Sequence, residues 1–242
     1  MINLIVVKSK RLWEIDTFRG TAIIMMIAYH IIFDLNYFNI YEIDLFFPPL
    51  RIFLYSIGTI FLIIVGISLH LSFLKNQMKL KYIKRGSMIF FIGILITIVT
   101  WFYPHDGFIV FGVIHCIGLS IIISYPFLKL YYINFAFGII IVFIGIFLTQ
   151  FSFNFNYLLF LGFRPNGFYT LDYFPILPWF GVVLIGIFIG KLFYKKDQIK
   201  SRSSHLSETY IIKKIAFLGR HSLIIYLIHQ PIILAIIYFF LL

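Results

Sequence analysis

The sequence predicts an all-α fold: a polytopic membrane helix bundle with about seven transmembrane helices. Of the 242 residues, 62% are hydrophobic and only 12% are charged, and the mean hydropathy is +1.01. Soluble domains carry about 25% charged residues and are less apolar. The composition therefore excludes an ordinary soluble domain and a disordered chain. It also excludes a disulfide scaffold, because Cys116 is the single cysteine.

Apolar runs of roughly 20 residues, the length that crosses a bilayer as a helix, recur along the chain. The third run is the shortest, and Gly86 and Tyr103 are the residues that would extend it. We expect residues 1–242 to form a single transmembrane domain. The predicted spans, in order, are Asp16–Phe38, Leu50–Phe73, Ser87–Phe102, Phe108–Phe127, Tyr131–Thr149, Pro175–Phe193 and His221–Leu242.

The basic residues predict the orientation of these spans. All of the 20 Lys and Arg residues except Arg51 and Arg164 fall on the side of the N-terminus. Cytoplasmic loops are rich in basic residues, so the N-terminus is expected in the cytoplasm and the C-terminus outside. The longest loops are then Leu192–Ile212, a polar linker inside, and Gln150–Phe174, an aromatic loop outside.

The net charge of +11 is thus explained by topology and by contact of the basic side with the lipid bilayer. Nucleic acid is not expected as a partner, because no basic stretch alternates with stacking aromatic residues. Residues Met1–Arg11 have no small-residue cleavage site, so no cleavable signal peptide is expected. A multi-pass protein of this kind fits the plasma membrane of a prokaryote.

Two ionisable residues of the first span, His30 and Asp34, indicate a functional site. Such residues are rare in membrane spans and face a bundle interior or a cavity. Their spacing of four places them on one helix face, with Cβ atoms about 6 Å apart. A carboxylate beside an imidazole fixes its tautomer and raises its basicity. The pair therefore suits a general base, with Asp34 orienting His30.

Further polar residues are expected at a similar depth. At about 1.5 Å per residue, His115 lies about 10 Å from the outer end of its span, and Asp172 is at the outer start of the sixth span. His229 and Gln230 occupy the last span, where Pro231 removes one helical hydrogen bond. We predict that they converge with His30 in the middle-to-outer bilayer. Singly, each also fits a packing residue. No tight ligand motif is present, so no metal is expected.

Asp16 and Arg19, at the cytoplasmic end of the first span, allow two interpretations. Their i,i+3 spacing predicts an ion pair on one helix face, which would make Arg19 a topology-setting charge. Alternatively, the planar donor fork of Arg19 would bind phosphate groups that arrive from the cytoplasm. The sequence leaves both open.

Four stretches carry a resemblance to a known family. They are Glu14–Ala22 with His30 and Asp34, Gly112–Ser120, Phe174–Gly181 and Leu218–Pro231. Together they resemble the catalytic-domain family of heparan-α-glucosaminide N-acetyltransferases. The ten residues between Arg19 and His30 are also similar to the signature motif of the broader membrane acyltransferase-3 group.

The resemblance implies an acyl-CoA-dependent transferase. It would move an acetyl or acyl group from cytoplasmic acetyl-CoA to an amine or hydroxyl of a sugar or glycan outside. His30 would be the general base or the acyl carrier, helped by Asp34. Asp16 and Arg19 would bind the co-substrate. The residues expected to bind the acceptor or stabilise the oxyanion are His115, Asp172, His229 and Gln230.

Two other functions compete with this interpretation. One is a transporter or flippase for a lipid-linked sugar, which would use the same polar residues without acyl-CoA. The other is a non-catalytic membrane subunit, in which these residues serve stability alone. A homo-oligomer is compatible with each of these functions.

Overall fold

The structure is a computed structural model that describes residues 12–195 and 209–241. The predicted basic residues ahead of the first span (Lys8, Lys10 and Arg11) and residues 196–208 of the predicted inner loop lie outside the described residues. In chain order the helices are α1 (Trp13–Tyr37), α2 (Pro48–Lys75), α3 (Lys79–Phe102), α4 (Val113–Ile123), η1 (Tyr125–Lys129), α5 (Tyr132–Leu148), η2 (Leu159–Leu161), α6 (Ile176–Phe193), α7 (Tyr210–Arg220) and α8 (Ser222–Phe240).

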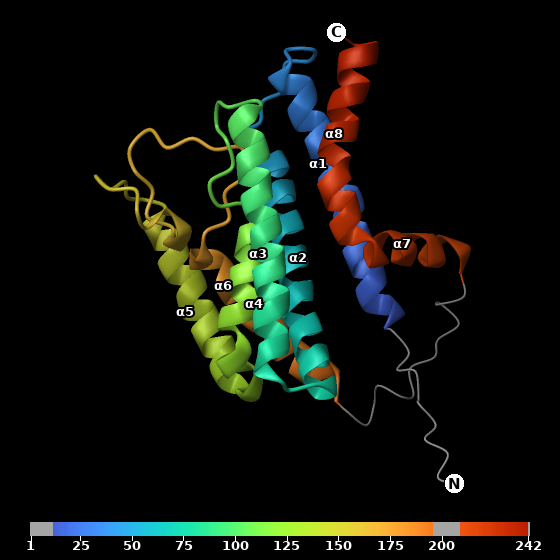
Figure 1. The fold of residues 1–242 in the computed structure, drawn as a ribbon, viewed down its shortest axis with the longest axis vertical. Coiled ribbons are helices and arrows are strands. Elements are labelled where there is room, and N and C mark those ends of the chain that lie inside the picture. Colours follow the sequence, from blue (N-terminus) through green and yellow to red (C-terminus); the bar gives the residue numbers. More distant parts are fainter. Residues whose placement is uncertain (1–11, 196–208, 242) are drawn as a thin grey trace. The chain divides into compact units, whose positions relative to one another are not determined.

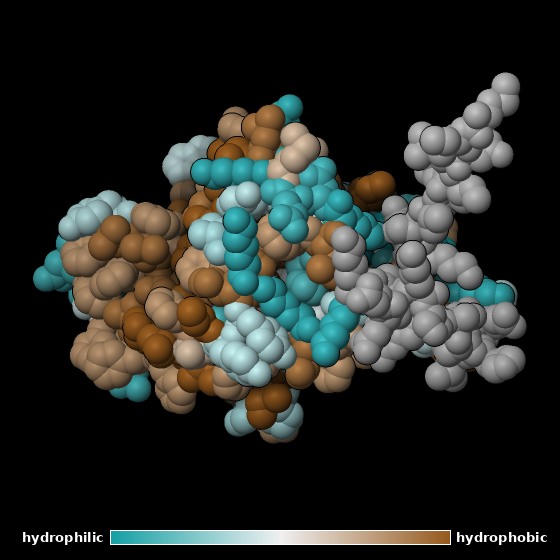
Figure 2. Space-filling view, turned by 90° about the horizontal axis from the view of Figure 1, so that it is seen from below, coloured by the Kyte–Doolittle hydropathy of each residue, from teal (hydrophilic) through white to brown (hydrophobic). Residues whose placement is uncertain are grey.

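The predicted all-α fold is confirmed. Across 12–195 and 209–241, extended pairing is limited to two isolated bridges, Phe111 with Tyr173 and Phe153 with Pro165. Five helices, α1, α2, α3, α6 and α8, are long and apolar enough to cross a membrane. The predicted spans four and five correspond to the shorter apolar helices α4 and α5. Many large apolar side chains are exposed, as lipid-facing helices require. Brown apolar side chains are also visible beside teal hydrophilic ones on the face seen in Figure 2.

The fourth predicted span begins too early. Phe108–Phe127 was expected to be helical, but α4 begins only at Val113. The preceding residues instead pair with the end of the 150–174 loop. The backbone N–H of Leu171 donates to the Gly107 carbonyl at 2.8 Å, and that of Phe174 donates to the Phe111 carbonyl at 2.9 Å. Apolar composition alone does not distinguish this extended pairing from a helix.

Helix α7 was not predicted, since its residues were assigned to the end of the inner loop and the approach to the last span. It is amphipathic: Ala216 and Gly219 are buried, whereas Lys213, Lys214 and Arg220 are exposed. Its basic residues made the segment resemble a solvated linker. The apolar spacing on one face is what stabilises it as a helix once it packs against α1.

The chain divides into two compact units, Met1–Ile57 with Lys196–Leu242 and Gly58–Lys195, and α2 begins in the first and continues in the second. In the first unit α1 packs against α7 and α8, and Figure 1 shows α7 at a steep angle to both. Backbones meet closely at this crossing. A Cβ added at Gly219 would overlap the backbone oxygen of Asp16, and one at Gly20 would overlap that of Ile215.

In the second unit α3 lies beside α4 and α5 lies beside α6 (Figure 1). Glycines again permit close packing: a Cβ at Gly118 would press on the backbone of Phe90 in α3, and one at Gly181 on the Gly138 carbonyl of α5. Small residues at helix contacts are typical of membrane bundles. Because lipid is as apolar as the side chains, close van der Waals packing of the backbones, rather than the hydrophobic effect, holds the helices together.

Candidate functional site

The first and last long helices bring four predicted site residues together within the first unit. His30 and Asp34 lie on α1, and His229 and Gln230 lie on α8. Asp34 is only 2% exposed and His229 only 7%. Buried polar groups in apolar helices are costly unless they are paired, so each member's partners decide what it can do.

Asp34 is held by Gln230 rather than by His30. The Gln230 Nε2 atom donates to both carboxylate oxygens of Asp34, at 2.9 Å each. The expected hydrogen bond from the His30 imidazole to the Asp34 carboxylate is not formed within the described residues. The reason is geometric: the amide nitrogen of Gln230 is equidistant from the two carboxylate oxygens, so that one of its N–H groups can be shared between them. Asp34 therefore ties α1 to α8.

His30 instead faces His229. Their ring centroids lie 4.7 Å apart, with the planes inclined by 67°. The Nδ1 atom of His229 is 2.6 Å from the Tyr226 carbonyl oxygen. A carbonyl can only accept, so Nδ1 must carry the proton and Nε2 keeps its lone pair. Neutral His229 therefore presents a base rather than a hydrogen-bond donor at Nε2.

Three buried polar atoms of this cluster have no hydrogen-bond partner within the described part of the chain. They are His30 Nδ1, His229 Nε2 and Gln230 Oε1. Leaving one such atom unpaired costs about 1–3 kcal/mol, and few occur in native folds. Three of them in one place make this cluster the candidate site of the described residues. Pro231 follows directly and has no N–H to donate to the preceding turn.

We expect Gln230→Leu to lower the free energy of unfolding by about 2 kcal/mol, because a carboxylate in a buried position would lose the amide donor that meets both of its oxygens. The melting temperature of the purified protein in detergent measures this. Asp34→Leu alone should be similarly harmful. The double variant should recover much of the loss, since replacing both partners by apolar groups can be nearly neutral. Strictly additive losses would contradict the pairing.

His115 lies in the second unit and already uses both ring nitrogens. Its Nδ1 accepts from the Gly112 N–H at 3.2 Å, and its Nε2 is 3.3 Å from the Thr97 hydroxyl oxygen. That hydroxyl donates to the Ile109 carbonyl. The ring stacks on Phe111, with centroids 5.4 Å apart. Of the two interpretations of His115, this geometry favours the packing residue.

Asp172 also has a structural task in the second unit. Its Oδ2 atom accepts from the Val113 N–H, at 2.9 Å, at the first turn of α4. A carboxylate there pairs with a free helix amide and with the helix dipole. The adjacent Tyr173 hydroxyl donates to the Leu159 carbonyl at 2.8 Å, and burial raises the pKa of Tyr173 to about 12. The 150–174 loop is thus anchored to the start of α4.

The predicted ion pair at the start of α1 is confirmed. Arg19 Nη1 lies 3.3 Å from Asp16 Oδ1, and the two side chains are 25% and 10% exposed. Trp13, which lies three residues before Asp16 on the same helix, was not predicted as a site residue. Its indole Nε1 is buried and has no acceptor within the described residues. An indole N–H can only donate, so it adds a donor suited to an anion.

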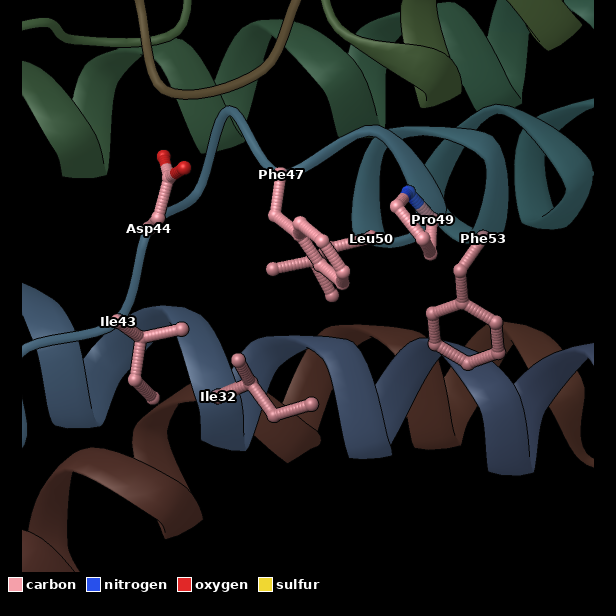
Figure 3. A pocket seen from close by; sticks show the side chains of 7 residues that line it. All are labelled: Ile32, Ile43, Asp44, Phe47, Pro49, Leu50 and Phe53. Carbon is pink, nitrogen blue, oxygen red and sulfur yellow. The ribbon is translucent and has the colours of Figure 1, made fainter.

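A mostly apolar pocket of about 540 Å³ lies between α1 and the start of α2, within the first unit. Figure 3 shows Phe47 and Phe53 pointing toward Ile32 of α1, whereas the Asp44 carboxylate points away. The Asp44 Oδ1 atom accepts from the Phe46 N–H. Such a lining does not suit a sugar.

As for a metal site, no three His, Cys, Asp or Glu side chains of the described residues gather closely enough to hold an ion.

Long apolar helices define a polytopic integral membrane protein, and α1 and α8 enclose a buried polar cluster. A family model for the catalytic domain of heparan-alpha-glucosaminide N-acetyltransferase matches residues 11–231. The chain belongs to this family, as the resemblance predicted, and is a transmembrane acetyltransferase of that class. Comparisons with curated proteins and with solved structures give no match.

Proposed function

We propose that the protein transfers an acetyl group from cytoplasmic acetyl-CoA to an amine or hydroxyl of a sugar or glycan on the outer side of a plasma membrane. The observation that carries the proposal is the α1–α8 cluster. There, a chain of an acetyltransferase family holds two histidines and a glutamine with unpaired, buried polar atoms. Membrane-embedded ionisable groups of this kind are functional by default.

In the proposed reaction His30 takes the proton of the attacking amine or hydroxyl. A bond forms between that nitrogen or oxygen and the acetyl carbonyl carbon. The carbon–sulfur bond breaks, and the departing thiolate is protonated to the free thiol. Gln230 and Asp34 hold α8 against α1 beside His30. His229 Nε2 offers a second proton acceptor, and it donates to a developing oxyanion once it is protonated.

A two-step route is the alternative. His30 attacks the thioester carbonyl, the carbon–sulfur bond breaks, and the thiolate takes the imidazole proton and leaves as free CoA. The acceptor then attacks the acetyl-histidine and returns the imidazole to its free form. In that route His229 is the base that deprotonates the acceptor. The two routes differ in kinetics, because an acyl-histidine gives ping-pong behaviour and direct transfer does not.

The start of α1 supplies groups that fit the co-substrate. Arg19 is a charged donor fork beside Asp16, and the Trp13 indole N–H is buried without an acceptor. Arginine binds phosphate bidentately, with charge-assisted hydrogen bonds. We therefore assign Arg19 and Trp13 to binding of the acetyl-CoA phosphates, with Asp16 orienting the Arg19 guanidinium, on the side that the basic residues mark as cytoplasmic.

The proposal is tested with purified protein in liposomes, with acetyl-CoA outside or inside and a glucosamine-type acceptor in the opposite compartment. Acetylated acceptor and free CoA should appear together, and only when each reactant faces its proper side. Sugar movement without CoA release would favour the transporter, and no reaction in either orientation would favour the non-catalytic subunit.

Arg19→Ala should raise the KM for acetyl-CoA about 10- to 100-fold, since a hydrogen bond to a charged group contributes about 1.5–3 kcal/mol. The KM for the acceptor should change little. Initial rates over a range of both substrates measure this. Arg51→Ala is the matched control, because Arg51 is an exposed arginine of the first unit. An unchanged KM for acetyl-CoA in Arg19→Ala would count against the phosphate assignment.

A further inference from the structure

Helix α7 is fixed at the boundary of the membrane by its neighbours. It ends at Arg220, and α8, a helix able to cross the bilayer, begins at Ser222. At its other contact, Gly219 packs on the Asp16 backbone in the first turns of α1. Both spanning helices therefore meet α7 near one of their ends. Figure 1 shows α7 at a steep angle to them, the direction that lies along a membrane surface.

The face of α7 that does not contact α1 combines cations with exposed apolar groups. The segment has no acidic residue. Tyr210, Ile211 and Phe217 are 69%, 65% and 53% exposed. The exposed cations beside them are Lys213, Lys214 and Arg220.

The cations are spread over the aromatic rings of the same face. Lys214 Nζ lies 4.4 Å from the centroid of the Tyr210 ring, and Arg220 Cζ lies 5.9 Å from that of Phe217. A basic face with interleaved aromatic and aliphatic groups is typical of helices that lie in the headgroup region. A soluble anion would account for the cations but would leave Ile211 and Phe217 in water.

We propose that α7 is an interfacial helix whose exposed face binds anionic phospholipid headgroups. The three cations meet the lipid phosphates, and the exposed apolar side chains reach the boundary with the acyl chains. This inference rests on membrane embedding and not on acetyl transfer, so the two proposals stand or fall separately.

The test compares the full-length protein with the triple variant Lys213→Gln, Lys214→Gln, Arg220→Gln in a neutral detergent. Fluorescent phosphatidylglycerol and phosphatidylcholine are titrated into each. The natural sequence should bind phosphatidylglycerol more tightly than phosphatidylcholine. The triple variant should lose about fivefold in affinity per removed charge, about a hundredfold in all. Binding of phosphatidylcholine should not change.

A charge-preserving variant, Lys213→Arg with Lys214→Arg, should bind phosphatidylglycerol as the natural sequence does. Circular dichroism and gel filtration show whether each variant is folded. Equal binding of the two lipids by the natural sequence would overturn the proposal. So would undiminished phosphatidylglycerol binding by the folded triple variant. An acetyl-CoA affinity that falls in the triple variant while lipid binding stays would identify the face as a co-substrate surface and overturn it as well.

Discussion

Replacing His30 by alanine is expected to lower the rate of acetyl transfer by about 10²- to 10⁴-fold, the usual contribution of a positioned acid or base. The fold should survive, because His30 Nδ1 makes no hydrogen bond within the described residues whose loss would destabilise the protein. The ring lies beside the rings of Tyr29 and His229. The rate of CoA release with acceptor present, together with the melting temperature, measures both effects.

The matched control is His105→Asn. His105 is an exposed histidine outside the cluster with a positive φ of 69°, and asparagine tolerates that conformation. The rate of acetyl transfer by His105→Asn should equal that of the natural sequence. A His30→Ala protein with normal turnover would remove His30 from either proposed route. If the route passes through acyl-histidine, the natural sequence should take up labelled acetyl from acetyl-CoA in the absence of acceptor. His30→Ala should lose this half-reaction.

Gly20→Leu is expected to destabilise the first unit by about 3 kcal/mol or more, since overpacking a tight contact typically costs 1–3 kcal/mol and overlap with backbone leaves little room for relief. A Cβ at Gly20 would already overlap the carbonyl of Ile215 in α7. The α1 and α7 backbones would have to separate. Loss of folded protein in detergent gel filtration and a lower melting temperature should both follow.

Ala28→Leu is the control, because Ala28 lies on the same helix with its side chain exposed. Its free energy of unfolding should lie within about 0.5 kcal/mol of that of the natural sequence, as for most surface substitutions. The separation in Gly20→Leu should also weaken acetyl-CoA binding, since Asp16 and Arg19 lie one turn or less before the glycine. A Gly20→Leu protein as stable as Ala28→Leu would contradict the close helix crossing.

The positions of the long helices could be predicted from the sequence because each is an apolar run of sufficient length. Helix α7 could not, since its stability depends on a glycine contact with α1 that no local pattern reveals. Likewise, the presence of His30, Asp34, His229 and Gln230 in the spans was visible, but their pairing was not. Local spacing favoured Asp34 with His30, whereas the amide nitrogen of Gln230, distant in the sequence, is the donor that meets both carboxylate oxygens.

His115 and Asp172 show what a sequence pattern leaves open. Each is a polar residue in or beside an apolar segment, and this alone suggested a role in the site. The structure adds that backbone amides at the start of α4 donate to both side chains. A sequence cannot show which helix ends need such acceptors until the preceding residues are known to be extended rather than helical.

The pairing of Asp34 with Gln230 joins residues separated by 196 positions. Because ribosomes add about 5–20 residues per second, Gln230 is synthesised roughly 10–40 s after Asp34. During that time the Asp34 carboxylate has no amide to meet it. Assembly of the cluster is therefore among the last events of biogenesis, and a chain that stops before α8 carries His30 but no site.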